Sequence, residues 1–590
     1  MKCFKNCRWQ NKFLSFLLLL TFTFALPPST AYAALNPLAV SNNKYGVHIL
    51  TDNKQDVEDA AALVNSSGGD WGYITLLIES NNRDLNRWQN FFNILRRKHL
   101  IPIVRIATKP VNAHWEVPYE GEEVAVADFL DKLVWPTKNR YVVIYNEPNH
   151  GQEWGKIADP ASYAKILDKT IDALKNKSSD FFVLNAGLDA STPHEPPDFY
   201  DEEKFLTEMN QAVPGIFNKL DGWVSHSYPN PGFKGKPIDT GKSSIRGYLW
   251  ELEILKKLGV TKELPVFVTE TGWKHSEGLK RDTSYPNVET VATYYKQAFS
   301  EVWSDPKIVA VTPFILNYQE APFDHFSFKK ITGEKQKIPA NGQTVLGIEY
   351  PEYYPAYQVL SELGKIKGSP IQESKASLIK GGIYKTLVSG ENYTISLTVK
   401  NTGQSIWTPE SKVMLVPVRG GSELGISLVE ITNPVEPGQE YTFSIAVKAP
   451  LSGSFTTELN LFKDGREFDS GRFLFTSEVR SPVTLKIKTI LPWERDPSGS
   501  YLLTIGGVTG TSIQNVSVDS SGLSSEVGSH SLLPGYEFDF TLDRPFYQSK
   551  VVHGRVDSGV NTIDFGELKP DFLAALLSPA ELWKLLPFSD

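Results

Sequence analysis

Two short segments of the sequence each end an apolar run with a glutamate. The first is VVIYNEP at 142–148 and the second is VFVTETGW at 266–273. Apolar runs of this length are typical of β-strands, and proline and glycine are residues that stop a strand. We therefore expect Glu147 and Glu270 at the C-terminal ends of two strands, 123 positions apart in the sequence. Two carboxyl groups that face each other across a pocket can cleave a glycosidic bond, one as acid and base and the other as nucleophile.

The pattern of residues 35–367 predicts the elements that would hold these glutamates. Short β-rich runs alternate with longer stretches of helical periodicity, of which 163–175 is an example. We expect a (β/α)₈ TIM barrel, whose active site lies at the C-terminal ends of its strands. Glu147 then follows the fourth run and Glu270 ends the seventh. The predicted runs are 45–50, 72–78, 101–107, 141–146, 181–187, 222–226, 265–270 and 308–316.

Residues 35–367 resemble the retaining glycoside hydrolases of clan A, in an arrangement similar to family 5. The resemblance rests on NEP at 146–148 after the fourth run, ETGW at 270–273 after the seventh and HSY at 226–228 after the sixth. The same TETGW sequence occurs in relatives that act on β-1,3-glucans and galactans, so the family stays open. The sequence departs from the pattern at 317–318, where Asn-Tyr follows the eighth run and many relatives have a tryptophan.

The resemblance implies a role for five residues. Glu270 would attack the anomeric carbon, while Glu147 would protonate the leaving oxygen and then activate water. Asn146 would bind the sugar 2-hydroxyl, Tyr228 would donate a hydrogen bond to the nucleophile, and His226 would line the adjacent subsite. For His226 the alternative is a structural histidine at a strand end.

Five further side chains are candidates for substrate binding. His48 and Arg105 stand toward the ends of the first and third runs, at the same face of the barrel. Arg105 could orient the nucleophile through charge-assisted bonds; alternatively, it could serve as a structural partner for a glutamate. Trp273 could stack on a sugar face, as could Trp115 and Trp154 in loops, or these three could be core residues.

The sequence predicts neither a metal nor a cofactor. Its ten histidines are scattered without the paired spacing of a helical zinc motif. The two-glutamate chemistry needs no metal ion.

The N-terminus has the order of a secretory signal peptide. Four cations precede an apolar run at 13–26, and a small-residue triplet follows at 31–33. We expect 1–33 to be a signal peptide and the protein to be secreted or at the cell surface, although an uncleaved anchor remains an alternative. Cys3 and Cys7 are the only cysteines, so the mature chain would have neither a disulfide nor a thiolate metal site.

The charge of the chain argues against nucleic acid as a partner. The full sequence has a net charge of −8, which becomes about −12 when the four cations of the leader are removed. No basic block follows Lys12. We expect a β-linked glycan as the partner of a monomer.

Beyond residue 367 helical periodicity stops and alternation of apolar and polar residues begins. Residues 369–478 predict a β-sandwich, and its VKNTGQSIW sequence at 399–407 resembles immunoglobulin-like accessory domains. This unit could bind glycan or space the catalytic domain from a surface, or it could be a packing module. Residues 482–568 predict a second, small β-rich domain. The apolar tail 569–590 could dock on that domain, contact a membrane surface or mediate association.

Two functions follow from the sequence. The first is a secreted retaining glycosidase that cleaves β-glycosidic bonds of poly- or oligosaccharides by double displacement; resemblance places β-glucans and mannans first. The alternative is a surface glycan-binding or adhesion protein in which the barrel is a non-catalytic scaffold. A protein that only binds glycan needs neither Glu147 nor Glu270.

Overall fold

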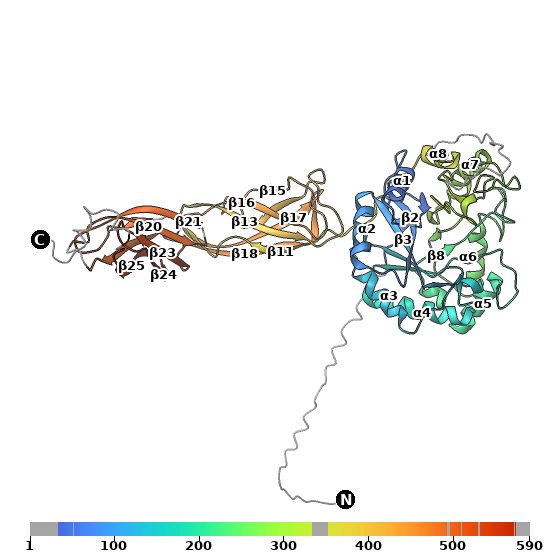
Figure 1. Cartoon of the computed structure of the whole chain (residues 1–590), viewed down its shortest axis with the longest axis horizontal. Coiled ribbons are helices and arrows are strands. Elements are labelled where there is room, and N and C mark those ends of the chain that lie inside the picture. Colours follow the sequence, from blue (N-terminus) through green and yellow to red (C-terminus); the bar gives the residue numbers. More distant parts are fainter. Residues whose placement is uncertain are drawn as a thin grey trace, which may run out of the picture.

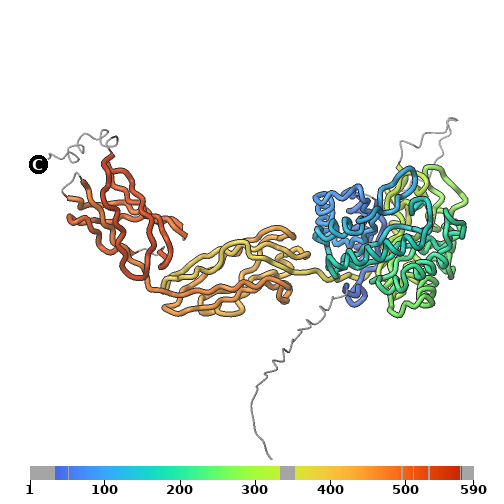
Figure 2. The backbone as a smooth tube through the Cα atoms, turned by 90° about the horizontal axis from the view of Figure 1, so that it is seen from below, coloured from blue at the N-terminus to red at the C-terminus, as the bar shows by residue number. Residues whose placement is uncertain are grey.

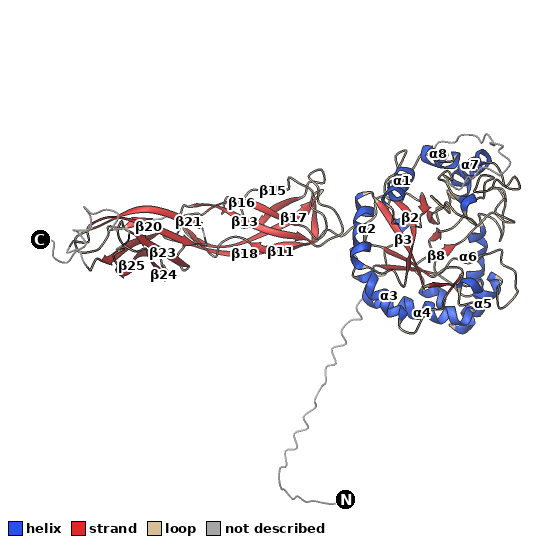
Figure 3. Ribbon diagram, viewed as in Figure 1, coloured by secondary structure: helices blue, strands red, loops and turns tan. Residues whose placement is uncertain are grey.

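The computed structural model describes residues 34–50, 52–332, 352–492, 496–508, 510–528 and 532–571, together with Leu573. The predicted leader and most of the predicted tail lie outside the described residues. Figure 1 shows an α/β part followed in chain order by two β-rich units along the long axis of the molecule. The helices drawn in Figure 3 belong to the first part. None of the helices in the described ranges combines the length and apolar character needed to cross a bilayer.

The α/β part is a closed barrel of parallel strands. One sheet has the order β1-β2-β3-β6-β7 and another the order β10-β9-β8. Parallel bridges from Leu184 to Gly222 and from Tyr45 to Val311 join the two sheets at both edges, which closes the barrel. Each of the eight predicted runs contains one barrel strand. The strands are β1 (Gly46–His48), β2 (Gly72–Glu79), β3 (Leu100–Ala107), β6 (Arg140–Ile144), β7 (Phe181–Leu184), β8 (Trp223–Ser225), β9 (Val266–Val268) and β10 (Ile308–Val311).

Helices surround these strands, and their ends follow from the sequence. Asparagine or aspartate caps the N-terminus of five helices with its side chain, at Asn53, Asp84, Asp159, Asp201 and Asn287. The helices are α1 (Lys54–Val64), α2 (Leu85–Arg97), α3 (Glu122–Asp131), α4 (Pro160–Lys177), α5 (Glu202–Ala212), α6 (Gly247–Lys257), α7 (Val288–Gln297) and α8 (Pro355–Glu362). Short helical turns are η1 (Pro37–Ala39), η2 (Gly151–Glu153), η3 (Ile216–Lys219), η4 (Ala298–Val302) and η5 (Asp324–Phe326), and a small hairpin pairs β4 (Pro110–Val111) with β5 (His114–Trp115).

Side chains fill the barrel interior in layers. Ile101 and Ile103 of β3 belong to an interior cluster that also holds Tyr141, Phe182 and Phe267. Because alternate residues of a strand share a face, this series continues on β3 to Arg105. The one arginine of β3 therefore points into the barrel at the C-terminal end of its strand.

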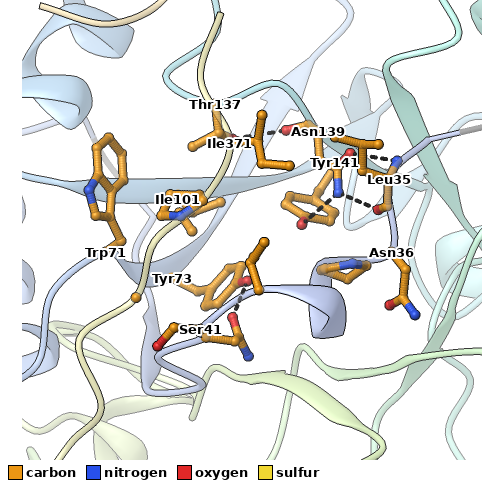
Figure 4. A pocket seen from close by; sticks show the side chains of 15 residues that line it. Leu35, Asn36, Ser41, Trp71, Tyr73, Ile101, Thr137, Asn139, Tyr141 and Ile371 are labelled. Carbon is orange, nitrogen blue, oxygen red and sulfur yellow. Dashed lines mark hydrogen bonds between the residues drawn. The ribbon is translucent and has the colours of Figure 1, made fainter. Parts of the chain in front are cut away.

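The segment before β1 covers the opposite end of the barrel. Figure 4 shows a small cavity there, lined by Leu35, Trp71 and Tyr141 among others. The side chain of Asn139 accepts from the backbone of Leu35 and donates to it, at 3.1 and 2.7 Å. The cavity measures about 30 Å³, which is the space of a single water molecule. The N-terminal end of the barrel is therefore closed.

The first β-rich unit has two sheets over one core. Their orders are β11-β13-β16 and β12-β18-β17-β14-β15, and Leu397, Trp407 and Phe443 lie in the shared core. This is a β-sandwich, and its last strand ends at Arg480, two residues beyond the predicted range. Its strands are β11 (Ala376–Gly381), β12 (Thr386–Val388), β13 (Asn392–Asn401), β14 (Met414–Arg419), β15 (Val429–Glu430), β16 (Glu440–Lys448), β17 (Gly453–Lys463) and β18 (Arg466–Arg480).

The second β-rich unit follows after two residues. It has sheets β22-β19-β25 and β21-β20-β23-β24 around a core that includes Leu485, Leu503 and Phe540. Val388 of the sandwich also belongs to this core, and Figure 2 shows the two units joined end to end. The strands are β19 (Val483–Ile490), β20 (Gly499–Gly507), β21 (Gly510–Val518), β22 (Val527–Gly528), β23 (Glu537–Asp543), β24 (Lys550–Arg555) and β25 (Gly559–Glu567).

Candidate active site

A pocket of about 370 Å³ opens at the C-terminal ends of the barrel strands. Both Glu147 and Glu270 line it, as do Asn146, Arg105 and Tyr228. The remaining residues of its wall are Leu50, Leu77, Ala107, Thr108, Trp115, Tyr145, His150, Glu153, Asp189, Phe233, Phe314, Tyr318, Phe323 and Phe326.

Glu147 is held at the pocket by an irregular backbone after β6. Tyr145 and Glu147 have positive φ values of 68° and 31°, a conformation that non-glycine residues rarely adopt and that is found at functional sites. The amide of Glu147 donates to the carbonyl of Gly187 at 3.1 Å. A side chain at Gly187 would collide with the ring of His226, since a Cβ atom there would lie 2.1 Å from it. His226 can therefore pack close enough to place its Nδ1 2.7 Å from Glu147 Oε1.

Glu270 lies two residues after β9 among groups that favour its ionised form. Arg105 Nη1 donates to Oε1, and the Tyr228 hydroxyl donates to Oε2 at 3.1 Å. Burial alone would raise the pKa of Glu270, but the charges of His226 and Arg105 outweigh it and lower the pKa to about 2. Burial raises the pKa of Tyr228, so this phenol stays a hydrogen-bond donor. Glu270 is therefore a carboxylate at neutral pH.

The two glutamates face each other at short distance. One carboxyl oxygen of Glu147 and one of Glu270 lie within 4.8 Å of each other, with a ring nitrogen of His226 in the same group. These three residues offer three ligand atoms, but the guanidinium of Arg105 also contacts Glu270. A cation held there would meet that positive charge, so the group fits two carboxyl groups that are each hydrogen-bonded to neighbouring side chains better than it fits a metal site.

Asn146 lies between Arg105 and a third carboxyl group. Its Oδ1 accepts from Arg105 Nη1 at 2.7 Å, and its Nδ2 donates to Glu153 Oε2 at 3.2 Å. The amide therefore has a fixed orientation and keeps one N–H hydrogen for another partner. The sequence pattern did not single out Glu153, although its position six residues after Glu147, in a loop beyond a barrel strand, was a usable signal.

Two residues that were predicted to contact the substrate do not line the pocket. His226 is 2% exposed and His48 is fully buried, and neither lines the pocket. His226 packs behind Glu147, and His48 Nδ1 lies 3.8 Å from Glu270 Oε1. Burial, followed by the charge of Arg105, lowers the pKa of His48 to about 3. His48 is therefore a neutral neighbour of the carboxylate.

Trp273 is a core residue, which corrects the prediction that it stacks on sugar. It is 1% exposed, and its ring packs against Tyr295 of α7 and Trp303. Trp154 is buried in the same way between Tyr145 and Tyr163. Trp115 of β5 is the one tryptophan among these three candidates that lines the pocket.

The pocket has one polar wall and one aromatic wall. Thr108, His150, Glu153 and Asp189 lie on the first, near the ends of β3, β6 and β7. The aromatic wall comes from the loops after β8 and β10, and Phe314 stands where the predicted eighth run continues beyond the observed end of β10. Its members pack edge to face and are Tyr228, Phe233, Phe314, Tyr318, Phe323 and Phe326.

No protein-family model and no curated protein matches the chain. Among solved structures, a family 39 glycoside hydrolase from Bacteroides cellulosilyticus WH2 is similar with a TM-score of 0.37 and 15% identity, over 70% of this chain and 79% of the other. A β-mannanase from Thermomonospora fusca has a TM-score of 0.31 and 13% identity over 48% and 82% of the two chains. A family 30 subfamily 8 xylanase from Clostridium acetobutylicum has a TM-score of 0.32 and 9% identity over 83% and 96%. Likeness at this level does not assign an activity to the chain.

Proposed function

We propose that this protein is a secreted glycoside hydrolase that cleaves β-glycosidic bonds of poly- or oligosaccharides with retention of configuration. The observation that carries the proposal is the separation of at most 4.8 Å between oxygens of Glu147 and Glu270 across an open pocket. Retaining enzymes hold their carboxyl groups about 5–5.5 Å apart, whereas inverting enzymes need about 6.5–9.5 Å to admit a water molecule. The short separation supports double displacement.

In the first step, the carboxylate of Glu270 attacks the anomeric carbon and the bond to the leaving oxygen breaks. Glu147 gives its proton to that oxygen, so a sugar ester of Glu270 and a free alcohol are formed. Arg105 and Tyr228 hold the attacking carboxylate in place through their hydrogen bonds. The pKa of about 2 keeps Glu270 ionised and available as the nucleophile.

In the second step, the carboxylate of Glu147 takes a proton from water, whose oxygen attacks the anomeric carbon. The ester bond breaks, Glu270 is released as a carboxylate, and Glu147 is protonated again. Two inversions at the same carbon give net retention. The free N–H of Asn146 is placed to bind the sugar beside this carbon, and Trp115 offers a face to a neighbouring sugar ring.

The N-terminal segment and the β-sandwich lie outside the catalytic barrel and have separate roles in the proposed function. We place the protein outside the cytoplasm or at the cell surface, on the strength of its N-terminal sequence. The sandwich at 369–478 is proposed to be an immunoglobulin-like packing module. It joins the barrel through residues near Thr137 and Asp70, at the N-terminal ends of the strands. The pocket opens at the other end, so the sandwich is not part of the substrate site.

The test is hydrolysis of a panel of β-glucans, mannans, xylans and galactans by the wild-type chain, Glu147→Gln and Glu270→Gln. We expect sugar release by the wild type and a loss of about a thousandfold or more in each variant. Glu120→Gln, at an exposed glutamate outside the pocket, is the matched control and should keep full activity.

Two outcomes would contradict the proposal. If NMR of the first-formed product shows an inverted anomer, the double displacement is wrong. If the wild type binds a glycan without releasing sugar and both variants bind equally well, the barrel is the non-catalytic scaffold of the alternative function.

A further inference from the structure

Glu153 differs from the other carboxyl groups of the pocket in its partners. Glu270 pairs with Arg105, Glu147 with His226, and Asp189 with His150. In the described part of the chain Glu153 forms no ion pair, and its carboxyl group accepts a hydrogen bond from Asn146. A half-buried carboxyl group without a cation is expensive to ionise, so its presence in the wall of the pocket needs a reason.

The loop that carries Glu153 is held rigidly. Its residues form η2, whose first amide, that of Gly151, donates to the carbonyl of Asp198 at 2.7 Å. The amide of Glu153 donates to the carbonyl of His150 at 3.0 Å, and the amide of Gly155 donates to the carbonyl of Trp115 at 2.8 Å. The buried ring of Trp154 lies directly after it in the sequence. Glu153 is therefore placed by the backbone and not by a flexible loop.

A continuous set of hydrogen bonds leads from Glu153 to the nucleophile. Glu153 accepts from the Nδ2 of Asn146, the Oδ1 of Asn146 accepts from Arg105, and Arg105 donates to Glu270. Because Arg105 can only donate and the carboxylate form of Glu153 can only accept, the two ends fix which way the amide of Asn146 points. If the amide of Asn146 were flipped, its N–H groups would face the guanidinium of Arg105 and its oxygen would face the carboxylate of Glu153.

The charges around Glu153 come from several elements. Burial and the charge of Glu147 raise the pKa of Glu153 to about 7, while Asn146 and Arg105 oppose this increase and Glu270 adds to it. The charge of Glu153 also helps to raise the pKa of His150, which is on the same loop. Glu153 therefore changes from neutral to negative close to neutral pH.

We propose that Glu153 is a positioning residue of the active site: its carboxyl group accepts from Asn146 and so orients the amide of Asn146 toward the sugar. This inference rests on the proposed glycosidase function.

Two variants separate orientation from charge. Glu153→Gln keeps an oxygen that can accept from Asn146 but never ionises. We expect kcat to fall by less than about tenfold. Glu153→Ala removes the acceptor as well, and we expect kcat to fall about 10- to 100-fold with little change in KM. Glu120→Gln is the control for the loss of an exposed carboxyl group.

A double variant tests whether Glu153 acts through Asn146. If it does, Asn146→Ala combined with Glu153→Ala loses no more activity than Asn146→Ala alone. Losses that multiply, or a Glu153→Ala variant as active as the wild type, would overturn the proposal.

A spectroscopic measurement keeps the inference testable if the wild type hydrolyses nothing. In protein labelled with ¹⁵N-asparagine, the side-chain amide of Asn146, assigned by its absence in Asn146→Ala, should shift between pH 6 and 8. This titration should vanish in Glu153→Gln. An amide signal that does not titrate in the wild type contradicts the inference, whereas a titrating signal without hydrolysis contradicts only the proposed function.

Discussion

Single residues determine which glutamate can act as the nucleophile. Glu147 and Glu270 are chemically identical, yet only Glu270 contacts a guanidinium and a phenol. The lowered pKa of Glu270 arises from its neighbours, because burial by itself acts in the opposite direction. Different environments can thus give two identical side chains different roles.

Removing the charge of Arg105 should make Glu270 harder to ionise. In Arg105→Gln the pKa of Glu270 rises from about 2 toward its ordinary value. Activity requires the carboxylate form, so the acid limb of kcat/KM should move up by about one to two pH units. Measuring kcat/KM from pH 3 to 8 with a soluble oligosaccharide gives the position of the acid limb.

Arg105→Lys is the matched variant for this experiment. It keeps the positive charge but loses the planar fork that contacts both Asn146 and Glu270. We expect its acid limb to stay closer to that of the wild type while kcat falls. Equal acid limbs in all three proteins would show that Arg105 does not control the ionisation of Glu270.

The sequence predicted which glutamates line the pocket better than it predicted which tryptophans do. A carboxyl group at the end of an apolar run has few structural uses, so Glu147 and Glu270 could be found from their positions. Trp273 also follows a strand end, but its direction is decided by α7, which lies more than ten residues further along the chain and packs against it. Burial of this kind depends on tertiary packing and is not encoded in local spacing.

At the scale of elements, the eight runs could be read from the sequence because each holds a strand bounded by a helix or loop. Strand lengths were less predictable: β7 and β10 end at Leu184 and Val311, several residues before the predicted runs do. Among the residues between these ends and the ends of the predicted runs, Phe314 lines the pocket. The β4–β5 hairpin, which carries Trp115, was not predicted because its strands have only two residues each.

Helices α5 and α6 place two glutamates in the layer behind β8. Glu202 and Glu251 are 0% and 1% exposed. Glu251 accepts from Trp223 Nε1 at 2.6 Å and from Ser225 Oγ at 2.8 Å, whereas both oxygens of Glu202 lack a hydrogen-bond partner among the described residues. Burial raises the pKa of Glu251 to about 7. Burial and the charge of Glu251 raise the pKa of Glu202 as well.

These shifts predict that the barrel becomes less stable as the pH rises. Between about pH 4.5 and the folded pKa, the unfolded chain releases protons that the folded chain retains, so the free energy of unfolding falls with pH. Glutamine does not titrate, and Glu202→Gln should therefore be more stable than the wild type at pH 8, with little difference near pH 4.5. Thermal or urea unfolding at several pH values measures the effect.

Glu203→Gln provides the control, since Glu203 is the next residue along α5 and is exposed. Its stability should follow that of the wild type at every pH. A Glu202→Gln protein whose stability falls with pH as steeply as that of the wild type would mean that Glu202 is not held neutral in the fold.

At the scale of the whole molecule, the sandwich is fastened to the end of the barrel that is remote from the pocket. The backbone amides of Gly368 and Ser369 donate to Asp70 and Ser41, and the side chain of Gln404 donates to the carbonyl of Thr137 at 2.8 Å. These barrel residues precede β2, β1 and β6. The alternation of apolar residues predicted the sandwich itself, but not this attachment, which depends on which polar groups meet after folding.

The attachment predicts that stability and catalysis respond differently to a change at the junction. Gln404→Ala leaves the buried carbonyl of Thr137 without its donor, which should cost about 1–3 kcal/mol of stability, seen as a lower melting temperature. The value of kcat/KM for a soluble oligosaccharide should not change, since the pocket lies at the opposite end of the strands. Gln358→Ala, at an exposed position of α8, should change neither quantity by much. A loss of kcat/KM in Gln404→Ala at a temperature where the protein is folded would mean that the two ends of the barrel are coupled, and the sandwich would then be more than a packing module.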